Sequence, residues 1–137
     1  MNGNETRAQA QLIGKQNQQD TLFDELLREK AVVLSRAGYA VEDALSKIME
    51  IGQKLDEQIS HLQHLYDPDV SGEKKIDKFL IFEQINSVID EYNEACRKAD
   101  LQYYYLIVTR EAMGLRRHET VRQLYSVPPK KKKLQAV

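Results

Sequence analysis

Cysteine, proline and glycine are scarce in this chain of 137 residues, which contains one, three and six of them respectively. Few prolines and glycines leave long stretches free for regular structure. The single Cys96 cannot form an intrachain disulfide, so a disulfide-stapled secreted scaffold is excluded. The length corresponds to one domain.

Long hydrophobic runs are also missing. The longest, Tyr103 to Val108, is too short to cross a bilayer. The first 20 residues contain no apolar core of signal-peptide length. We therefore expect a cytoplasmic protein without a membrane span.

Charge is abundant but unevenly distributed. Residues 1–109 carry 12 Lys and Arg against 19 Asp and Glu, a net charge of −7, whereas residues 110–137 carry 8 against 2, a net charge of +6. A basic C-terminal end of this kind could bind an anionic partner. Alternatively, the tail could lie against an acidic neighbouring body.

A seven-residue repeat of apolar side chains indicates a first long helix. Its positions are Leu27, Leu34, Val41, Ile48, Leu55 and Leu62. Because the repeat passes through Gly38 and Gly52 without a shift, we predict one continuous helix from Asp20 or Thr21 to Tyr66. The Gln- and Asn-rich residues 1–20 are predicted to form a flexible polar leader.

A second helix is predicted after the break at Asp67–Gly72, where proline, aspartate and glycine favour a turn. It extends to about Met113, with Gly114 as its terminator. The aromatic and β-branched segment 101–108 would also suit a strand, but the helical register of the preceding residues favours a helix. That register consists of Phe82, Ile85, Ile89, Tyr92, Cys96, Ala99, Tyr103 and Leu106.

The predicted fold is all-α: a long, coiled-coil-like antiparallel helical hairpin with a short C-terminal helix at about Arg117 to Tyr125. This domain spans residues 21–127, and a solvated basic tail follows at 128–137. Folding at the break makes the numbers of facing residues sum to about 139, which places 101–108 opposite 31–38. Two helices are too narrow to cover all the apolar side chains, so we expect dimerisation into a four-helix bundle.

Two motifs in or near the break suggest metal binding but lack essential features. The segment Asp67-x-Asp69-x-Ser71-Gly72 resembles half of a calcium loop, yet its twelfth position is Lys78 rather than glutamate. His61 and His64 have helical spacing, but both lie off the apolar repeat and are predicted to face solvent. Cys96 lies on the repeat, where a thiol packs as a small buried group. We therefore predict no catalytic residue, cofactor or metal.

Two sets of surface residues are predicted to make contacts. The expected protein interface comprises Leu34, Val41, Leu45, Ile48, Leu55, Ile59, Phe79, Leu80, Phe82, Val88, Tyr104 and Tyr105. The three adjacent tyrosines, 103–105, point in different directions around a helix and suit packing rather than base stacking. The candidate anion or nucleic-acid contacts are Arg110, Arg116, Arg117, Arg122, Lys130, Lys131, Lys132 and Lys133.

These patterns favour a non-enzymatic structural or adaptor protein that acts through helix–helix contacts. The expected partner is a second copy, most simply in a homodimer, or another helical protein; no small-molecule substrate is evident. One alternative is a nucleic-acid-associated protein that uses residues 110–133. The Pro-Pro-Lys-Lys-Lys-Lys run in that segment resembles a short nuclear-import signal, and its binding would be weak and salt-sensitive. A further alternative, based on shape alone, is a small helical export or assembly chaperone.

Overall fold

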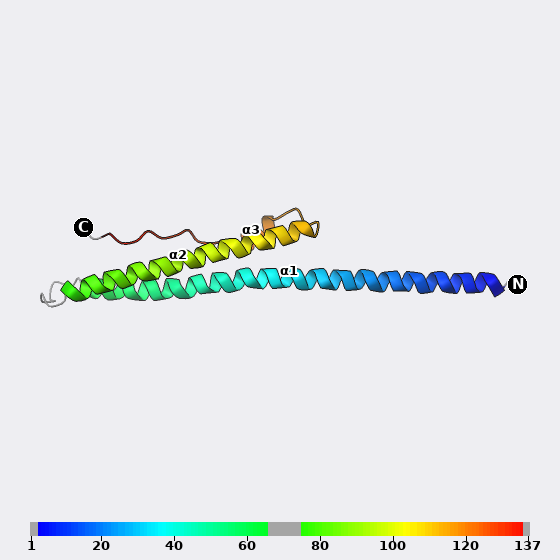
Figure 1. Ribbon diagram of the computed structural model, residues 1–137, viewed down its shortest axis with the longest axis horizontal. Coiled ribbons are helices and arrows are strands. Elements are labelled where there is room, and N and C mark those ends of the chain that lie inside the picture. Colours follow the sequence, from blue (N-terminus) through cyan, green and yellow to red (C-terminus); the bar gives the residue numbers. More distant parts are fainter. Residues whose placement is uncertain (1–2, 66–74, 136–137) are drawn as a thin grey trace. The chain divides into compact units, whose positions relative to one another are not determined.

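The computed structural model describes residues 3–65 and 75–135, in which the regular secondary structure consists of helices without strands. Helix α1 spans Gly3–Leu65, α2 spans Lys75–Ala112 and α3 spans Glu119–Leu124 (Figure 1). The all-α class, the helical hairpin and the short final helix are therefore confirmed. The chain divides into two units, Met1–Arg36 and Ala37–Val137.

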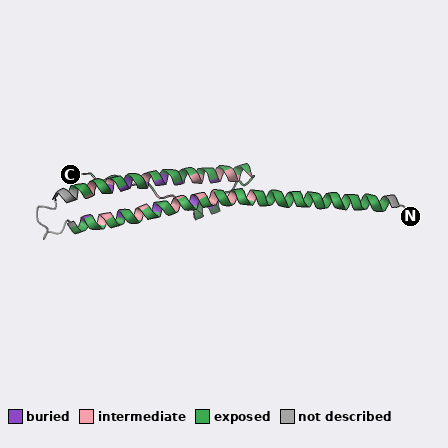
Figure 2. Ribbon diagram, turned by 60° about the horizontal axis from the view of Figure 1, so that its bottom comes forward, coloured by how far each residue is buried: buried purple, intermediate pink, exposed green. Residues whose placement is uncertain are grey.

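Helix α1 begins earlier than the sequence analysis expected. It starts at Gly3 rather than near Asp20, so the predicted boundary at 20/21 is wrong. The reason is that glutamine and alanine, which are frequent in residues 5–19, have good intrinsic helix propensity even without large apolar neighbours. Side chains 5–29 of this helix are exposed (Figure 2).

The continuity of α1 through both glycines is confirmed, and each glycine faces a tyrosine. A Cβ atom added at Gly38 would lie 3.5 Å from the hydroxyl oxygen of Tyr125. One added at Gly52 would lie 3.6 Å from Cε2 of Tyr92. Both distances are ordinary van der Waals contacts. The glycines allow the tyrosine rings to pack closely, but a methyl group would also fit at either position.

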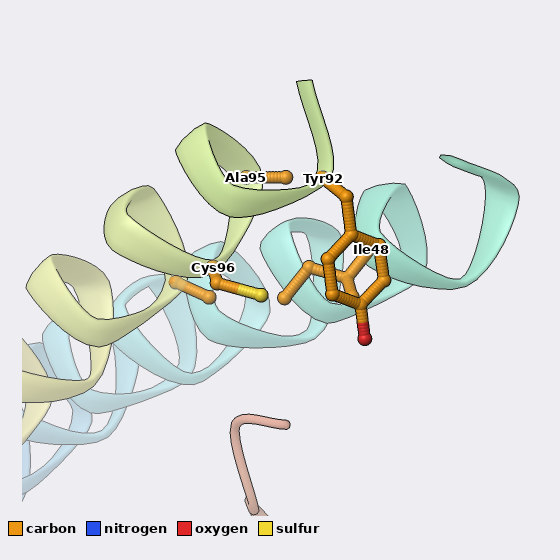
Figure 3. Packing of buried hydrophobic residues seen from close by; sticks show 5 residues of the cluster. Ile48, Tyr92, Ala95 and Cys96 are labelled. Atoms are coloured by element: carbon orange, nitrogen blue, oxygen red, sulfur yellow. The ribbon is translucent and has the colours of Figure 1, made fainter. Parts of the chain in front are cut away.

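Residues 37–65 of α1 pack antiparallel against α2 through three groups of buried side chains. Val41 packs with Leu106, Ile48 with Cys96 and its neighbours, and Leu55 with Ile85. Figure 3 shows Ile48 of α1 against Tyr92, Ala95 and Cys96 of α2. The apolar repeat therefore forms the core of the hairpin.

The register of this pairing matches the expected one for two of the three buried groups. The numbers of Leu55 and Ile85, and those of Ile48 and Tyr92, each sum to 140, against the expected 139. In the third group the numbers of Val41 and Leu106 sum to 147, so Leu106 lies about two helical turns from its expected position opposite residues 31–38. The fold-back residues 66–74 lie outside the described part of the chain.

Helix α2 ends where Gly114 was expected to terminate it. Gly114 has a φ of +87°. The main-chain amide of Leu115 donates to the carbonyl of Arg110 at 2.9 Å, and the main-chain amide of Gly114 donates to the carbonyl of Glu111 at 3.0 Å. This pair of bonds is the Schellman motif, which satisfies the last helical carbonyls. The segment 101–108 is helical, as predicted.

A third layer covers one side of the hairpin. Val121 of α3 and Tyr125 pack around Val41 and Leu106. Beyond them, Val127 packs against the Ile48 group and Leu134 against the Leu55 group. Non-helical residues 126–135 supply two of the three contacts of this layer, although a solvated tail was expected at 128–137.

Candidate functional site

The C-terminal segment, residues 126–135, follows α2 in the opposite direction and is attached to it by two asparagines. The side-chain amide nitrogen of Asn93 donates to the main-chain carbonyl of Lys131 at 2.8 Å. The main-chain amide of Lys131 donates back to Oδ1 of Asn93 at 2.7 Å. Asn86 makes the same pair with Leu134, at 3.1 and 2.7 Å. Each side-chain amide thus satisfies both main-chain groups of one residue.

Lysine side chains of this segment also contact α2. Nζ of Lys131 lies 5.0 Å from the centre of the Tyr92 ring, within the range of a cation–π contact. Nζ of Lys133 lies 3.1 Å from Oδ2 of Asp90. The four lysines are exposed, as expected of a solvated tail, but their backbone is held against the helix. The basic end therefore contacts Asp90 and Tyr92 of its own chain.

The predicted arginine contacts have different environments. Arg110 is half-buried and donates through Nε to Nδ1 of His118 at 3.3 Å, and through Nη2 to the carbonyl of Arg117 at 2.9 Å. Arg116, Arg117 and Arg122 are exposed. Arg110 therefore holds the turn before α3, and the other three side chains face solvent.

Sequence reasoning missed His118, which is buried beneath that turn. Because Nδ1 accepts from Arg110, the ring proton lies on Nε2, which donates to Oε1 of Glu111 at 3.1 Å. His118 directly precedes α3, in the short connection after α2, and therefore gave no periodic signal. Its position follows from the Schellman turn, which brings residue 118 back over α2.

Several residues predicted to form a protein interface are instead in the core of the hairpin. Val41, Ile48, Leu55 and Val88 are at most 3% exposed, so they are not available to a second chain in this structure. The reason is that the two helices of one chain already bury the seven-residue repeat against each other. Leu34, Leu45, Ile59 and Phe82 are half-buried.

The remaining predicted interface residues are exposed. Phe79 is 61% exposed, Leu80 51%, Tyr104 61% and Tyr105 49%. Tyr103 instead packs against the Val41 group, so the three tyrosines do point in different directions. The rings of Tyr104 and Tyr105 lie 6.1 Å apart at 52°.

An open groove of about 840 Å³ lies between α1 and α2 in the hairpin unit. Its apolar lining includes Ala44, Ile51 and Leu101. Charged side chains from both helices surround that lining, among them the ion pair of Arg97 with Glu94 at 2.7 Å. This hydrogen bond lowers the pKa of Glu94 and raises that of Arg97. The groove contains none of the four residues that hold Lys131, Lys133 and Leu134 by polar contacts, namely Asn86, Asp90, Tyr92 and Asn93.

The other unit, Met1–Arg36, carries an exposed apolar face. Leu22, Leu26 and Val33 line one edge of it, and Phe23 and Leu27 the other. At 100° per residue these five side chains, the N-terminal stripe, fall within an arc of about 140°. They are 44% to 64% exposed.

Chemically reactive groups are few in the described residues. Cys96 is buried and unbonded; burial, with a smaller effect from Asp100, raises the pKa of its thiol. His61 and His64 are exposed, as predicted. No cluster of metal-ligating side chains occurs within residues 3–65 and 75–135 whose side chains are described. The half calcium loop, Asp67 to Gly72 with Lys78, lies outside those side chains.

No known protein family, curated protein or solved structure matches this chain. None of the described helices combines the length and apolarity needed to cross a membrane.

Proposed function

We propose that this protein is a non-enzymatic helical adaptor that self-associates through the N-terminal stripe. The observation that supports this proposal is the continuation of the seven-residue apolar repeat into residues 1–36, where Leu27 is half exposed. In the hairpin unit the same repeat is buried against α2. A repeat with this period is the pattern that helices use to pair.

The exposure of this stripe supports the presence of a partner. An isolated amphipathic helix in water is marginally stable, and most helical stability in proteins comes from burial of the apolar face. Burying the half-exposed side chains of the stripe is worth about 1 kcal/mol each, or on the order of 5 kcal/mol per chain. A contiguous apolar face of this kind is typical of an interaction surface.

Charge supports a second copy as that partner. Residues 5–36 carry five basic and five acidic side chains, which gives no net charge and no overall repulsion between copies. In a dimer, the stripe of one chain packs against the stripe of the other. The same residues of both chains are then buried, as two-fold symmetry requires. The protein would then act as a structural or adaptor module in which the hairpin units remain available.

The test is light scattering coupled to size exclusion. We expect twice the chain mass for the wild type and one chain mass for Phe23→Asp/Leu26→Asp. The matched control is Thr21→Asp/Ser35→Asp, which adds the same charges opposite the stripe and should remain dimeric. A wild-type monomer, or equal masses for both variants, would refute the proposal.

A second candidate function is the binding of another protein's helix, in the manner of a small helical chaperone. The observation that favours it is the open groove of about 840 Å³, because its apolar lining and charged surroundings suit an amphipathic helix. Ala44→Glu should then abolish capture of that helix without changing the mass of the dimer. Nucleic-acid binding through residues 110–133 is less favoured, since Lys131 and Lys133 already contact Tyr92 and Asp90.

A further inference from the structure

The two asparagines on α2 bind the C-terminal segment through its main chain. All four of their hydrogen bonds, 2.7 to 3.1 Å long, go to the N–H and C=O groups of Lys131 and Leu134. Every peptide offers these groups at each residue other than proline, which lacks the N–H. This part of the contact therefore selects an extended shape rather than a sequence.

The spacing of the asparagines matches an extended chain. Asn86 and Asn93 are seven residues apart, which corresponds to a rise of about 10.5 Å along a helix. Three residues of extended or polyproline-type chain, the distance from Lys131 to Leu134, cover about 9–10 Å. One face of α2 thus presents two asparagines whose separation matches three residues of an extended peptide, so that both can bind its main chain.

Side chains around the asparagines add selectivity. The ring of Tyr92 receives the lysine at the first bound position, and Asp90 receives the lysine two residues later. The side chain of Leu134 packs against the Leu55 group. The contacts therefore define the pattern Lys-x-Lys-Leu. Asn93 binds the main chain of its first lysine, and Asn86 binds the main chain of its leucine.

We propose that this face of α2 is a binding site for extended, lysine-rich peptide segments of the pattern Lys-x-Lys-Leu. The C-terminal segment is its resident occupant, and a segment of the same pattern from another chain binds by displacing it. This site shares no residue with the N-terminal stripe, so it does not depend on the proposed self-association. Because the resident segment is tethered, its effective concentration is on the order of millimolar, and an added peptide competes poorly until that segment is loosened.

The experiment uses the full chain with Lys131→Pro/Leu134→Pro, which removes the two N–H donors and loosens the resident segment while leaving α2 unchanged. The probe is a fluorescein-labelled peptide with the sequence of residues 126–135, followed by fluorescence polarisation. We expect saturable binding to this variant and at least tenfold weaker binding to the wild type. A probe carrying the same two prolines should not bind.

Two further variants distinguish main-chain binding from simple charge attraction. Adding Asn86→Ala/Asn93→Ala should weaken binding of the probe at least tenfold, whereas adding Ser87→Ala at an exposed neighbour should not. Circular dichroism verifies that helix content is retained. Equal binding of a scrambled probe of the same charge, or no effect of the asparagine substitutions, would overturn the proposal. So would failure of the loosened variant, with intact helices, to bind the probe.

Amide hydrogen exchange of the wild-type chain gives an independent measurement that needs no loosened segment. The amides of Lys131 and Leu134 should exchange at least tenfold more slowly than that of Lys132. Asn86→Ala/Asn93→Ala should remove this difference. Uniformly fast exchange across residues 130–134 in the wild type would contradict the site.

Discussion

The hydroxyl of Tyr125 donates a hydrogen bond of 2.8 Å to Oε1 of Glu42, joining residues 83 positions apart. The same hydroxyl lies against Gly38, one turn earlier on α1. This contact anchors the end of α3 to the hairpin, and the C-terminal segment begins one residue later.

Replacing Tyr125 by Phe keeps the ring and removes this hydrogen bond. Because the bond is exposed, we expect a loss of about 1 kcal/mol in the free energy of unfolding, measured by urea denaturation. Glu42→Gln, which retains an acceptor, should lose less. An unchanged midpoint for Tyr125→Phe would mean that the contact contributes nothing to stability.

Gly52 lies in the interior of α1, where glycine is unfavourable, and its position leaves room for a methyl group beside Tyr92. Gly52→Ala should therefore raise the free energy of unfolding by about 0.5–1 kcal/mol. The exposed neighbour Gln53→Ala serves as a control, with an expected change within about 0.5 kcal/mol. A destabilised Gly52→Ala would show that Tyr92 needs the space.

Gly114 is the opposite case, because its positive φ of 87° strains any residue with a side chain. Gly114→Ala should cost about 1 kcal/mol, again by urea denaturation. Gly114→Asn should lose less, because asparagine tolerates the left-handed conformation better. The prediction is wrong if alanine is tolerated as well as asparagine.

Alkaline pH should destabilise the protein. Burial raises the pKa of the Cys96 thiol above its ordinary value of 9.0, and burial likewise raises the pKa of Tyr92 and Tyr125 above 10.0. The folded state therefore binds more protons than the unfolded state once the pH exceeds about 9, so stability is fully present below that pH and falls above it. Urea denaturation at pH 7.5 and pH 10 measures the loss.

Cys96→Ala provides the control for this pH dependence, because it removes the group that titrates first. The variant should lose less stability between pH 8 and pH 9.5 than the wild type. Parallel curves for the two proteins would exclude a contribution from the thiol. A thiol reagent should likewise modify native Cys96 far more slowly than the urea-unfolded chain, since only the thiolate of an accessible cysteine reacts quickly.

Much of the hairpin could be predicted from local chemistry. The seven-residue repeat gave the helical course of α1 through both glycines, and Gly114 gave the end of α2. The position of the break predicted the pairing of Leu55 and Ile48 with α2, but not that of Val41 with Leu106. The apolar pattern missed the first turns of α1, where helix propensity operates without an apolar signal.

The candidate peptide site was beyond sequence reasoning. Asn86 and Asn93 stand seven residues apart beside the apolar repeat, which is a weak hint, since asparagines on an exposed helix face usually bind water. Their partners lie 48 and 38 residues away in a segment that looked like a free basic tail. Nothing in the local sequence of either segment specifies the other.

The sequence by itself therefore determined the helices, their apolar faces and the cap at Gly114, because these depend on interactions within a few residues of the chain. Only the tertiary structure decided the burial of His118 and the docking of residues 126–135. His118 meets Arg110 and Glu111 across the turn after α2, and the C-terminal segment meets asparagines 38 and 48 residues away. These contacts join groups outside any one helix, so the local sequence of each element does not specify them.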